Sequence, residues 1–312
     1  MSNSQIIQAQ QLKQGRLTAA INFPKVVIID TISYCDLKCS MCGHKDMRRT
    51  KGRMSMKLFK KIIDEIADID KNTRVWLVFF GEALLLKKTT LFPMIRYAKE
   101  KGLADVVLNS NGNLLDERAA RGLIDAGLDA FYVGIDAFTP ETYKEVRVGG
   151  NYQKVVNNVI NLINLKKTLG ADKPKVYVQF VEMDINRNEV SGFIEFWKNK
   201  GAVVKIRPMV SWAGLVNAPN LTIPMLERWH CYWAMQTMSI TDTGKVVTCA
   251  VDVDARCVVG DVTHQTLREV WLGKLKELRE LHSSNKFELL PYPCRDCKDW
   301  QVARAEYYLS EC

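Results

Sequence analysis

Three cysteines in one short segment carry the spacing in this 312-residue chain that most clearly points to chemistry. Cys35, Cys39 and Cys42 follow the pattern C-x3-C-x2-C. Three thiolates at this spacing can bind three irons of a four-iron cluster, and the fourth iron then has no protein ligand. A metal with an open coordination position is typical of a catalytic site, whereas a structural site is closed by protein ligands. The pattern therefore predicts a reactive iron–sulfur centre.

The alternative interpretation is that the three cysteines are inert core residues, because a free cysteine often behaves as a small hydrophobic side chain. Their context favours ligands. They follow residues 26–30, which we expect to form a buried strand, and they precede a polar, basic stretch at 43–53, which we expect to form a loop. Thiols exposed in a loop after a strand are typical of metal ligands.

Composition limits the class of protein. Hydrophobic residues make up 47% of the chain, enough for one large domain and a small one. No run of 18 apolar residues and no secretory signal are found in the sequence, so we expect a cytoplasmic protein with reduced thiols and no membrane partner. The net charge of +9 is scattered, which favours a solvated basic surface over an anionic substrate and gives no reason to expect nucleic-acid binding.

Strands and helices are expected to alternate through the first two thirds of the chain. The predicted strands are 26–30, 74–80, 105–109, 130–136, 175–183 and 203–208. The predicted helices are 56–69, 91–101, 116–126, 140–146, 152–169 and 189–200, three of which end at Gly102, Gly127 and Gly201. Such alternation predicts an α/β fold, a partial (β/α)6 TIM barrel. The cysteine loop follows the first strand, at the end where barrel enzymes place their chemistry.

The pattern changes after residue 209, so we expect three parts: an N-terminal helical arm (1–24), the barrel (25–210) and a small Cys-rich α+β domain (211–312). In the small domain, residues 238–249 read as a hairpin with its turn at 242–244, and 267–282 as one helix.

A second candidate metal site lies in the small domain. Cys231, Cys249, Cys294 and Cys297 form a possible tetrad, and the last two have the C-x2-C spacing of metal ligands. A zinc ribbon that holds the domain together and a second four-iron cluster are both compatible with four thiolates. Two further cysteines, Cys257 and Cys312, are left over, and Cys257 follows Cys249 closely enough to lie near the second metal.

Together these motifs resemble the radical S-adenosylmethionine (SAM) superfamily. Residues 231–297, through Cys-x12-Gly-x4-Cys, Gly260-Asp-Val262 and Cys294-Arg-Asp-Cys297, resemble the short auxiliary-cluster domain called Twitch, a relative of SPASM. The resemblance implies a SAM-binding [4Fe–4S] cluster, one auxiliary [4Fe–4S] cluster, and SAM bound to the open iron. It also implies reductive cleavage of SAM to a 5′-deoxyadenosyl radical, with an electron donor such as flavodoxin or ferredoxin.

The same resemblance implies which residues contact SAM: Met41, Gly81, Glu82, Asn109, Asn111 and Arg147. Met41 would pack on the adenine, and Glu82 would meet the amino group of SAM. Gly134 stands where the family usually has a serine, so one hydroxyl contact to SAM is lost. Arg147 would pair with the SAM carboxylate through its planar guanidinium, and the alternative is a surface charge at a helix end.

The layout is similar to that of 2-deoxy-scyllo-inosamine dehydrogenase and of radical SAM sugar epimerases. This implies hydrogen-atom abstraction from a C–H bond of a carbohydrate or cyclitol-type small molecule. The product would come from epimerisation, with Cys257 as hydrogen donor, or from two-electron oxidation. Two alternatives remain open: a radical SAM peptide maturase that acts on a ribosomal peptide, and a non-enzymatic binding protein stapled by zinc.

Overall fold

The computed structural model describes residues 22–78, 80–86, 89–303 and 308–309. Most of the predicted N-terminal arm, residues 1–21, and Cys312 lie outside the described residues. In the described part of the chain, no helix is both long and apolar enough to cross a membrane.

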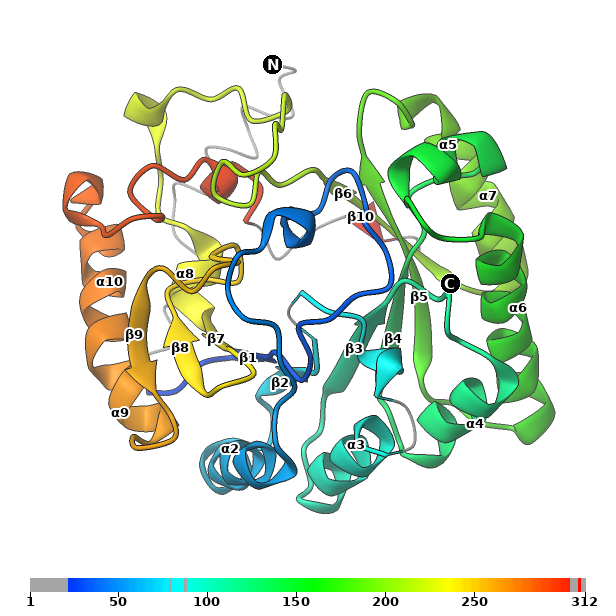
Figure 1. Cartoon of the computed structure of the whole chain (residues 1–312), viewed down its shortest axis with the longest axis horizontal. Helices are drawn as coiled ribbons and strands as arrows, with labels where there is room; N and C mark the ends of the chain where they lie inside the picture. The colour runs from blue at the N-terminus through cyan, green and yellow to red at the C-terminus, as the bar shows by residue number, and fades with distance from the viewer. Residues whose placement is uncertain (1–21, 79, 87–88, 304–307, 310–312) are drawn as a thin grey trace.

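One sheet of ten strands runs through the molecule, in the order β10-β6-β5-β4-β3-β2-β1-β7-β8-β9 (Figure 1). The strands are β1 (Val26–Ile29), β2 (Arg74–Trp76), β3 (Val106–Ser110), β4 (Ala130–Gly134), β5 (Lys175–Glu182), β6 (Val203–Pro208), β7 (Thr237–Ile240), β8 (Lys245–Val247), β9 (Val258–Asp261) and β10 (Tyr308–Leu309). Strands β1 to β6 pair in parallel and in chain order. Helical crossovers connect them, so the predicted partial α/β barrel is confirmed.

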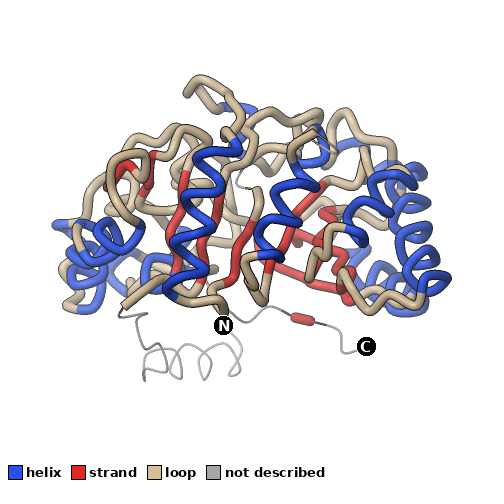
Figure 2. Tube along the Cα trace, turned by 90° about the horizontal axis from the view of Figure 1, so that it is seen from below, coloured by secondary structure: helices blue, strands red, loops and turns tan. Residues whose placement is uncertain are grey.

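Helices cover the outer face of the barrel sheet, as Figure 2 shows. They are α2 (Met56–Ile69), α3 (Leu91–Glu100), α4 (Glu117–Asp125), α5 (Pro140–Val146), α6 (Tyr152–Leu169) and α7 (Val190–Lys200), followed in the second domain by α8 (Tyr232–Gln236), α9 (Leu267–Leu272) and α10 (Lys274–Ser283). In α2, Phe59, Ile62 and Ile66 recur at helical spacing and are buried in the main core. Burial of each such side chain stabilises the folded state by about 1.5–3 kcal/mol.

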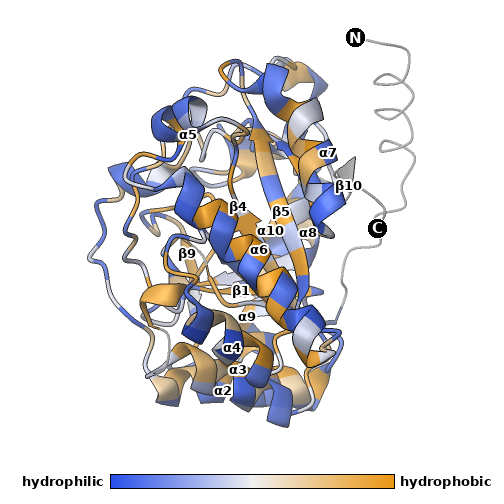
Figure 3. Ribbon diagram, turned by 90° about the vertical axis from the view of Figure 1, so that its right-hand side faces the viewer, coloured by the Kyte–Doolittle hydropathy of each residue, from blue (hydrophilic) through white to orange (hydrophobic). Residues whose placement is uncertain are grey.

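The surface of the helical layer is polar where it meets solvent. In Figure 3, hydrophilic and hydrophobic residues alternate along α6, as expected for a helix with one face on the sheet, while β5 is largely hydrophobic. Helix ends are fixed by the residues that the sequence supplies there. Asp116 accepts a hydrogen bond from the amide of Ala119 at the start of α4, and Gly201, at φ 84°, ends α7.

Most predicted elements of the barrel are confirmed within a residue or two, but β2 ends at Trp76 and not at residue 80. The prediction of one helix over 267–282 is wrong, because the chain breaks at Gly273 into α9 and α10. Gly273 adopts φ −90° and ψ −121°, outside the helical region. A Cβ there would lie 2.8 Å from the carbonyl oxygen of Glu269 in the last turn of α9, so glycine fits the tight break at the end of this helix.

The small domain shares the sheet of the barrel. Strand β7 pairs in parallel with β1, and β8 and β9 extend the sheet in antiparallel fashion. The hairpin between β7 and β8 turns at Gly244, at φ 91°, where it was predicted. The expected boundary near residue 210 stays a prediction, and the parts on its two sides are joined by main-chain hydrogen bonds across β1 and β7.

A buried ion triad also joins the two parts. Arg49, in the loop after the first three cysteines, contacts Asp30 at the end of β1 and Asp242 in the β7–β8 turn, at 2.5 Å each. Burial raises the pKa of Asp30 to about 6, and the guanidinium of Arg49 opposes that effect. Arg49 therefore compensates two carboxylates that have little access to water.

Replacing Arg49 by methionine leaves the two carboxylates buried without a counter-charge. We expect Arg49→Met to lower the free energy of unfolding by about 3–5 kcal/mol, the range found when one partner of a buried ion pair is removed. Denaturant unfolding of the oxygen-free protein measures it. Arg74→Met is the matched control, because its pair with Asp105 is partly exposed (42% and 31%) and an exposed pair contributes about 1 kcal/mol or less. Equal small losses in both variants would count against the triad.

Candidate active site

The loop that carries Cys35, Cys39 and Cys42 lies at the carboxyl end of β1, at the mouth of the barrel. Two main-chain hydrogen bonds fix it to the end of α5: the amide of Lys38 donates to Val148 and that of Ser40 to Val146, at 2.9 and 3.0 Å. The expectation of three exposed thiols is wrong, since Cys39 is buried and the other two are half-buried. The loop is folded inward because Leu37, Met41 and Val146 form a small hydrophobic cluster around the thiols.

Burial has an electrical consequence for these thiols. It raises the pKa of Cys35 to about 12 and that of Cys42 to about 11, because a thiolate loses its hydration there. A buried thiolate is stable only beside a positive charge, and bound iron supplies that charge. A donor set of three closely spaced sulfurs therefore fits an iron–sulfur cluster.

The end of β2 brings Gly81 and Glu82 against this loop. The amide of Glu82 donates to the carbonyl of Tyr34 at 2.8 Å. A Cβ on Gly81 would lie 2.0 Å from the carbonyl oxygen of Ile32 and 2.7 Å from that of Tyr34, so only glycine permits this approach. Phe80 packs with Trp212 at a ring distance of 5.2 Å.

The carboxyl group of Glu82 binds the next loop along the sheet. It accepts hydrogen bonds from the amide of Leu84, the hydroxyl of Ser110 and the amide of Asn111, at 2.7–2.9 Å. Burial raises its pKa to about 7. Glu82 thus joins the ends of β2 and β3, and its predicted contact to the SAM amino group stays a prediction.

Asn109 and Asn111, at the end of β3, bind different partners. Asn109 accepts a hydrogen bond from Gln179 of β5 at 3.2 Å. Asn111 donates to Asp36 at 2.7 Å, and Asn113 donates to the other oxygen of Asp36 at 2.9 Å. Asp36 lies between the first two cysteines, so this contact ties the cysteine loop to β3. Sequence reasoning missed Asp36, although its place inside the cysteine motif is a usable signal.

Arg147 is drawn into the site and is not a surface charge. Its side chain is only 13% exposed, pairs with Asp136, and donates to the sulfur of Cys39 at 3.5 Å. Gly134 makes room for it, because a Cβ there would lie 2.0 Å from Nη2 of Arg147. The surface alternative is therefore wrong. Its predicted partner, the SAM carboxylate, stays a prediction, and the guanidinium already has a buried carboxylate beside it.

Met41 is buried on the inner side of the cysteine loop, and its carbonyl accepts a hydrogen bond of 2.7 Å from the indole of Trp212. Trp212, at φ 52°, comes from the segment that the sequence marks only as a linker. Its indole also lies 3.0 Å from where a Cβ on Gly43 would stand. The linker therefore closes over the cysteine loop, a role that residue type alone did not reveal.

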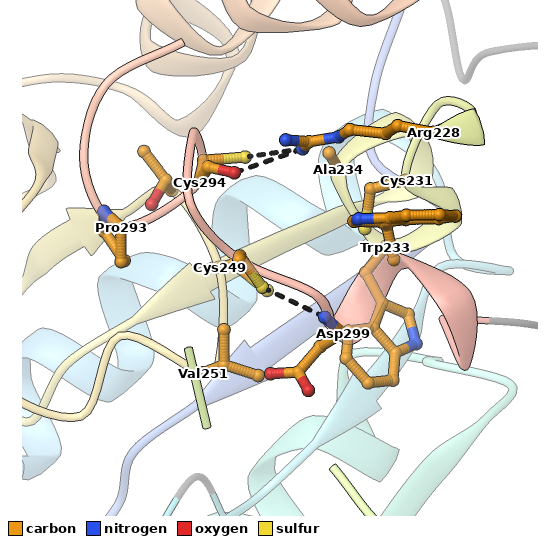
Figure 4. A pocket seen from close by; sticks show the side chains of 12 residues that line it. Arg228, Cys231, Trp233, Ala234, Cys249, Val251, Pro293, Cys294 and Asp299 are labelled. Atoms are coloured by element: carbon orange, nitrogen blue, oxygen red, sulfur yellow. Dashed lines mark hydrogen bonds between the residues drawn. The ribbon is translucent and has the colours of Figure 1, made fainter. Parts of the chain in front are cut away.

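The second group of cysteines surrounds one cavity, shown in Figure 4. Cys231 precedes α8, Cys249 follows β8, and Cys294 and Cys297 come from the loop after α10, so distant segments meet there. All four thiols line the same cavity together with Arg228 and Asp299. Burial raises the pKa of each thiol, to about 12 for Cys294. A cavity faced by four sulfurs fits a metal cluster.

The spacing of these side chains is wider than a single ion requires. Among the described residues, no group of three or more His, Cys, Asp or Glu side chains is close enough to hold one metal ion. Zinc would draw four thiolates to about 2.3 Å from one centre. A four-iron cluster spaces its ligands around a larger core, so both cysteine groups remain compatible with it.

Cys257 lies near the second group but does not belong to it. It is half-buried, its amide donates to Asp252 at 2.8 Å, and it is not among the residues that line the cavity. Its charge contributes to the raised pKa of Cys294, which agrees with the predicted proximity to the second site.

Comparison with known families agrees with this geometry. Residues 29–170 match the radical SAM superfamily, and residues 231–298 match an iron–sulfur cluster-binding domain named SPASM. The chain therefore contains a radical SAM domain followed by a SPASM-type domain, as the cysteine motifs predict. The two domains imply [4Fe–4S] clusters and SAM as cofactors.

Two relatives differ in what their names say they do. A "Probable GTP 3′,8-cyclase" of Methanococcus maripaludis is 33% identical over 173 residues, 55% of this chain and 54% of that protein. The "tungsten-containing aldehyde ferredoxin oxidoreductase cofactor-modifying protein" of Pyrococcus furiosus is 26% identical over 57% of this chain and 49% of its own length. The chain thus spans about half the length of the curated relatives it matches.

Solved structures share the fold over most of the chain. BtrN in complex with AdoMet and 2-DOIA has a TM-score of 0.62 at 18% identity, over 92% of this chain and 97% of that one. SuiB of Streptococcus suis bound to the precursor peptide SuiA has a TM-score of 0.68 at 13% identity, over 96% of this chain and 74% of its own. At these identities the likeness establishes the fold alone.

Gly81 gives a direct test of how the cysteine loop is seated. In Gly81→Ala the new Cβ would collide with main-chain atoms, which can move only if the whole cysteine loop shifts. Two four-iron clusters hold about eight irons, and we expect this variant to lose about four of them. Iron and sulfide analysis of oxygen-free protein measures this. Gly170→Ala is the control: its φ of 61° costs about 1 kcal/mol, but nothing lies within 4 Å, so the iron content should not change. Full iron in Gly81→Ala would refute this seating.

Proposed function

We propose that this chain is a radical SAM enzyme that reductively cleaves SAM and abstracts a hydrogen atom from a C–H bond of a carbohydrate or cyclitol-type small molecule. The reaction would end in epimerisation or in two-electron oxidation. The observation that carries the proposal is the three-cysteine loop, held at the barrel mouth above an inner face lined by polar side chains.

The proposed roles follow from position. Cys35, Cys39 and Cys42 would hold the SAM-binding cluster, and Cys231, Cys249, Cys294 and Cys297 the auxiliary one. When bound, the first cluster supplies the electron that cleaves the sulfonium of SAM. Arg147 donates a hydrogen bond to the sulfur of Cys39 and so places a positive charge beside it. Glu82 and Asp36 keep the ends of β2 and β3 pressed against the loop.

The inner face of the barrel supports a small polar substrate. Tyr132 and Tyr177 stack at 4.3 Å, and the ammonium of Lys205 lies 5.2 Å from the ring of Tyr132. These tyrosines form a cluster separate from the helix-facing core. Asn109 of β3 and Gln179 of β5 lie on the same face, Asn109 level with Tyr132 and Gln179 nearer the mouth of the barrel. Hydroxyl groups of a polyol find donors and acceptors on such a surface.

Arg207 adds to this surface. It follows Lys205 by two positions on β6, so both side chains share one face of the sheet. Its Nε is buried without a hydrogen-bond partner among the described residues. A buried donor in this state favours a ligand that carries acceptor oxygens.

The cleavage reaction can be tested without knowledge of the substrate. Oxygen-free, iron-loaded protein incubated with SAM and dithionite should form 5′-deoxyadenosine, measured by chromatography and mass spectrometry. The Cys35→Ala/Cys39→Ala/Cys42→Ala variant should lose this product entirely, because no thiolates remain to hold the first cluster. Cleavage that persists in the triple variant would overturn the proposal.

The fate of the substrate radical is tested in heavy water, with Cys257→Ala beside the unchanged protein. An epimerase that uses Cys257 as hydrogen donor should place solvent deuterium at the inverted carbon, and the variant should lose this product. An oxidation should give a product two hydrogens poorer in both proteins. Deuterium transfer from a labelled peptide, and none from labelled polyols, into 5′-deoxyadenosine would replace the carbohydrate proposal by a peptide maturase.

A further inference from the structure

His282 of α10 touches two of the cysteines that line the second cavity. Its side chain is almost fully buried. Nδ1 lies 3.4 Å from the amide nitrogen of Cys231, and Nε2 lies 3.4 Å from the sulfur of Cys294. The imidazole therefore bridges the segment before α8 and the loop after α10.

The two contacts determine where the imidazole proton lies. A main-chain amide can only donate, so Nδ1 must accept the hydrogen bond from Cys231 and carries no proton. A neutral imidazole then bears its proton on the other nitrogen, Nε2. That nitrogen faces the sulfur of Cys294. His282 is thus arranged to donate a hydrogen bond to this sulfur.

Arg228 also contacts this sulfur, as Figure 4 shows. Its Nη2 lies 4.0 Å from the sulfur and 3.1 Å from the carbonyl oxygen of Cys294. The guanidinium is held in place because Nη1 donates to the carbonyl of Arg295 at 2.8 Å and the group lies 4.7 Å from the ring of Phe287. Cys294 therefore meets a neutral donor and a positive charge.

We propose that His282 and Arg228 are positioning residues that act through Cys294 and raise the reduction potential of the auxiliary cluster. This rests on the proposed function, since it requires a cluster in the second cavity. Reduction adds negative charge that is shared with the ligand sulfurs, and donors aimed at a sulfur stabilise that charge. A raised potential suits an electron acceptor, so the arrangement favours oxidation of the substrate over epimerisation.

The test isolates the auxiliary cluster in the full chain by using Cys35→Ala/Cys39→Ala/Cys42→Ala as background. Its midpoint potential is measured by titration followed by electron paramagnetic resonance. His282→Leu removes the donor, and we expect the ratio of reduced to oxidised cluster at a fixed potential to fall about tenfold, equal to about 59 mV for one electron. His282→Gln keeps an N–H donor near the position of Nε2, so it should retain most of the potential.

His230→Leu is the matched control, because His230 lies in the same domain and no hydrogen bond joins it to a cysteine among the described residues. Its midpoint should equal that of the background protein. An unchanged midpoint in iron-loaded His282→Leu would overturn the inference and leave the proposed function standing. A background protein that binds no iron would instead remove the second cluster itself.

A spectroscopic measurement keeps the inference testable if His282→Leu loses its cluster. The chain has four histidines, so labelling them with nitrogen-15 gives few candidate signals. Pulsed electron paramagnetic resonance of the reduced auxiliary cluster should show coupling to a labelled histidine nitrogen. His282→Gln should abolish this coupling while the iron content stays the same. No coupling in the background protein would also reject the proposal.

Discussion

The site depends on one constraint: the cysteine loop can bring its thiols together only if neighbouring strand ends hold it. The loop has few hydrogen bonds of its own, and buried polar groups from β2, β3 and the β4–α5 region supply what it lacks. Glu82 fixes the β2 and β3 ends to each other, Asp36 receives two asparagine amides, and Arg147 reaches Cys39. Each contact joins residues far apart in the chain, so the loop is set by the fold and not by its own sequence.

The same constraint explains the glycines near the mouth of the barrel. Gly81 permits the contact between β2 and the loop, and Gly134 gives space to the guanidinium of Arg147. A side chain at position 134 would occupy the space that Arg147 now fills. The guanidinium of Arg147 therefore lies largely buried, paired with Asp136 and in contact with the sulfur of Cys39.

The barrel could be predicted from the sequence because its signal is local. Apolar residues at helical spacing, glycines at helix ends and short apolar strands predict α2, α6 and β6 at or near their observed bounds. The sequence also predicted that Cys231, Cys249, Cys294 and Cys297 belong together, since metal ligands have characteristic spacings, and they line one cavity. Asp36, Trp212 and His282 were missed as functional residues, because their significance arises from tertiary contacts. His282 reads in the sequence as one polar residue of an amphipathic helix, and the break at Gly273 that sets its helix apart needs backbone angles to be seen.

The pairing of β7 with β1 bears on how the two halves of the molecule can move. The first cysteine loop leaves the end of β1, and Cys249 lies just beyond the hairpin that β7 begins. Main-chain hydrogen bonds thus join β1 to β7, the strands that precede the two cysteine groups. The Arg49 triad adds a second link between the same strands. Hinged closure, one way in which two-domain enzymes bring reactive centres together, would have to bend this strand ladder or break the Arg49 triad. The strand pairing and the triad therefore favour a constant distance between the two cysteine groups.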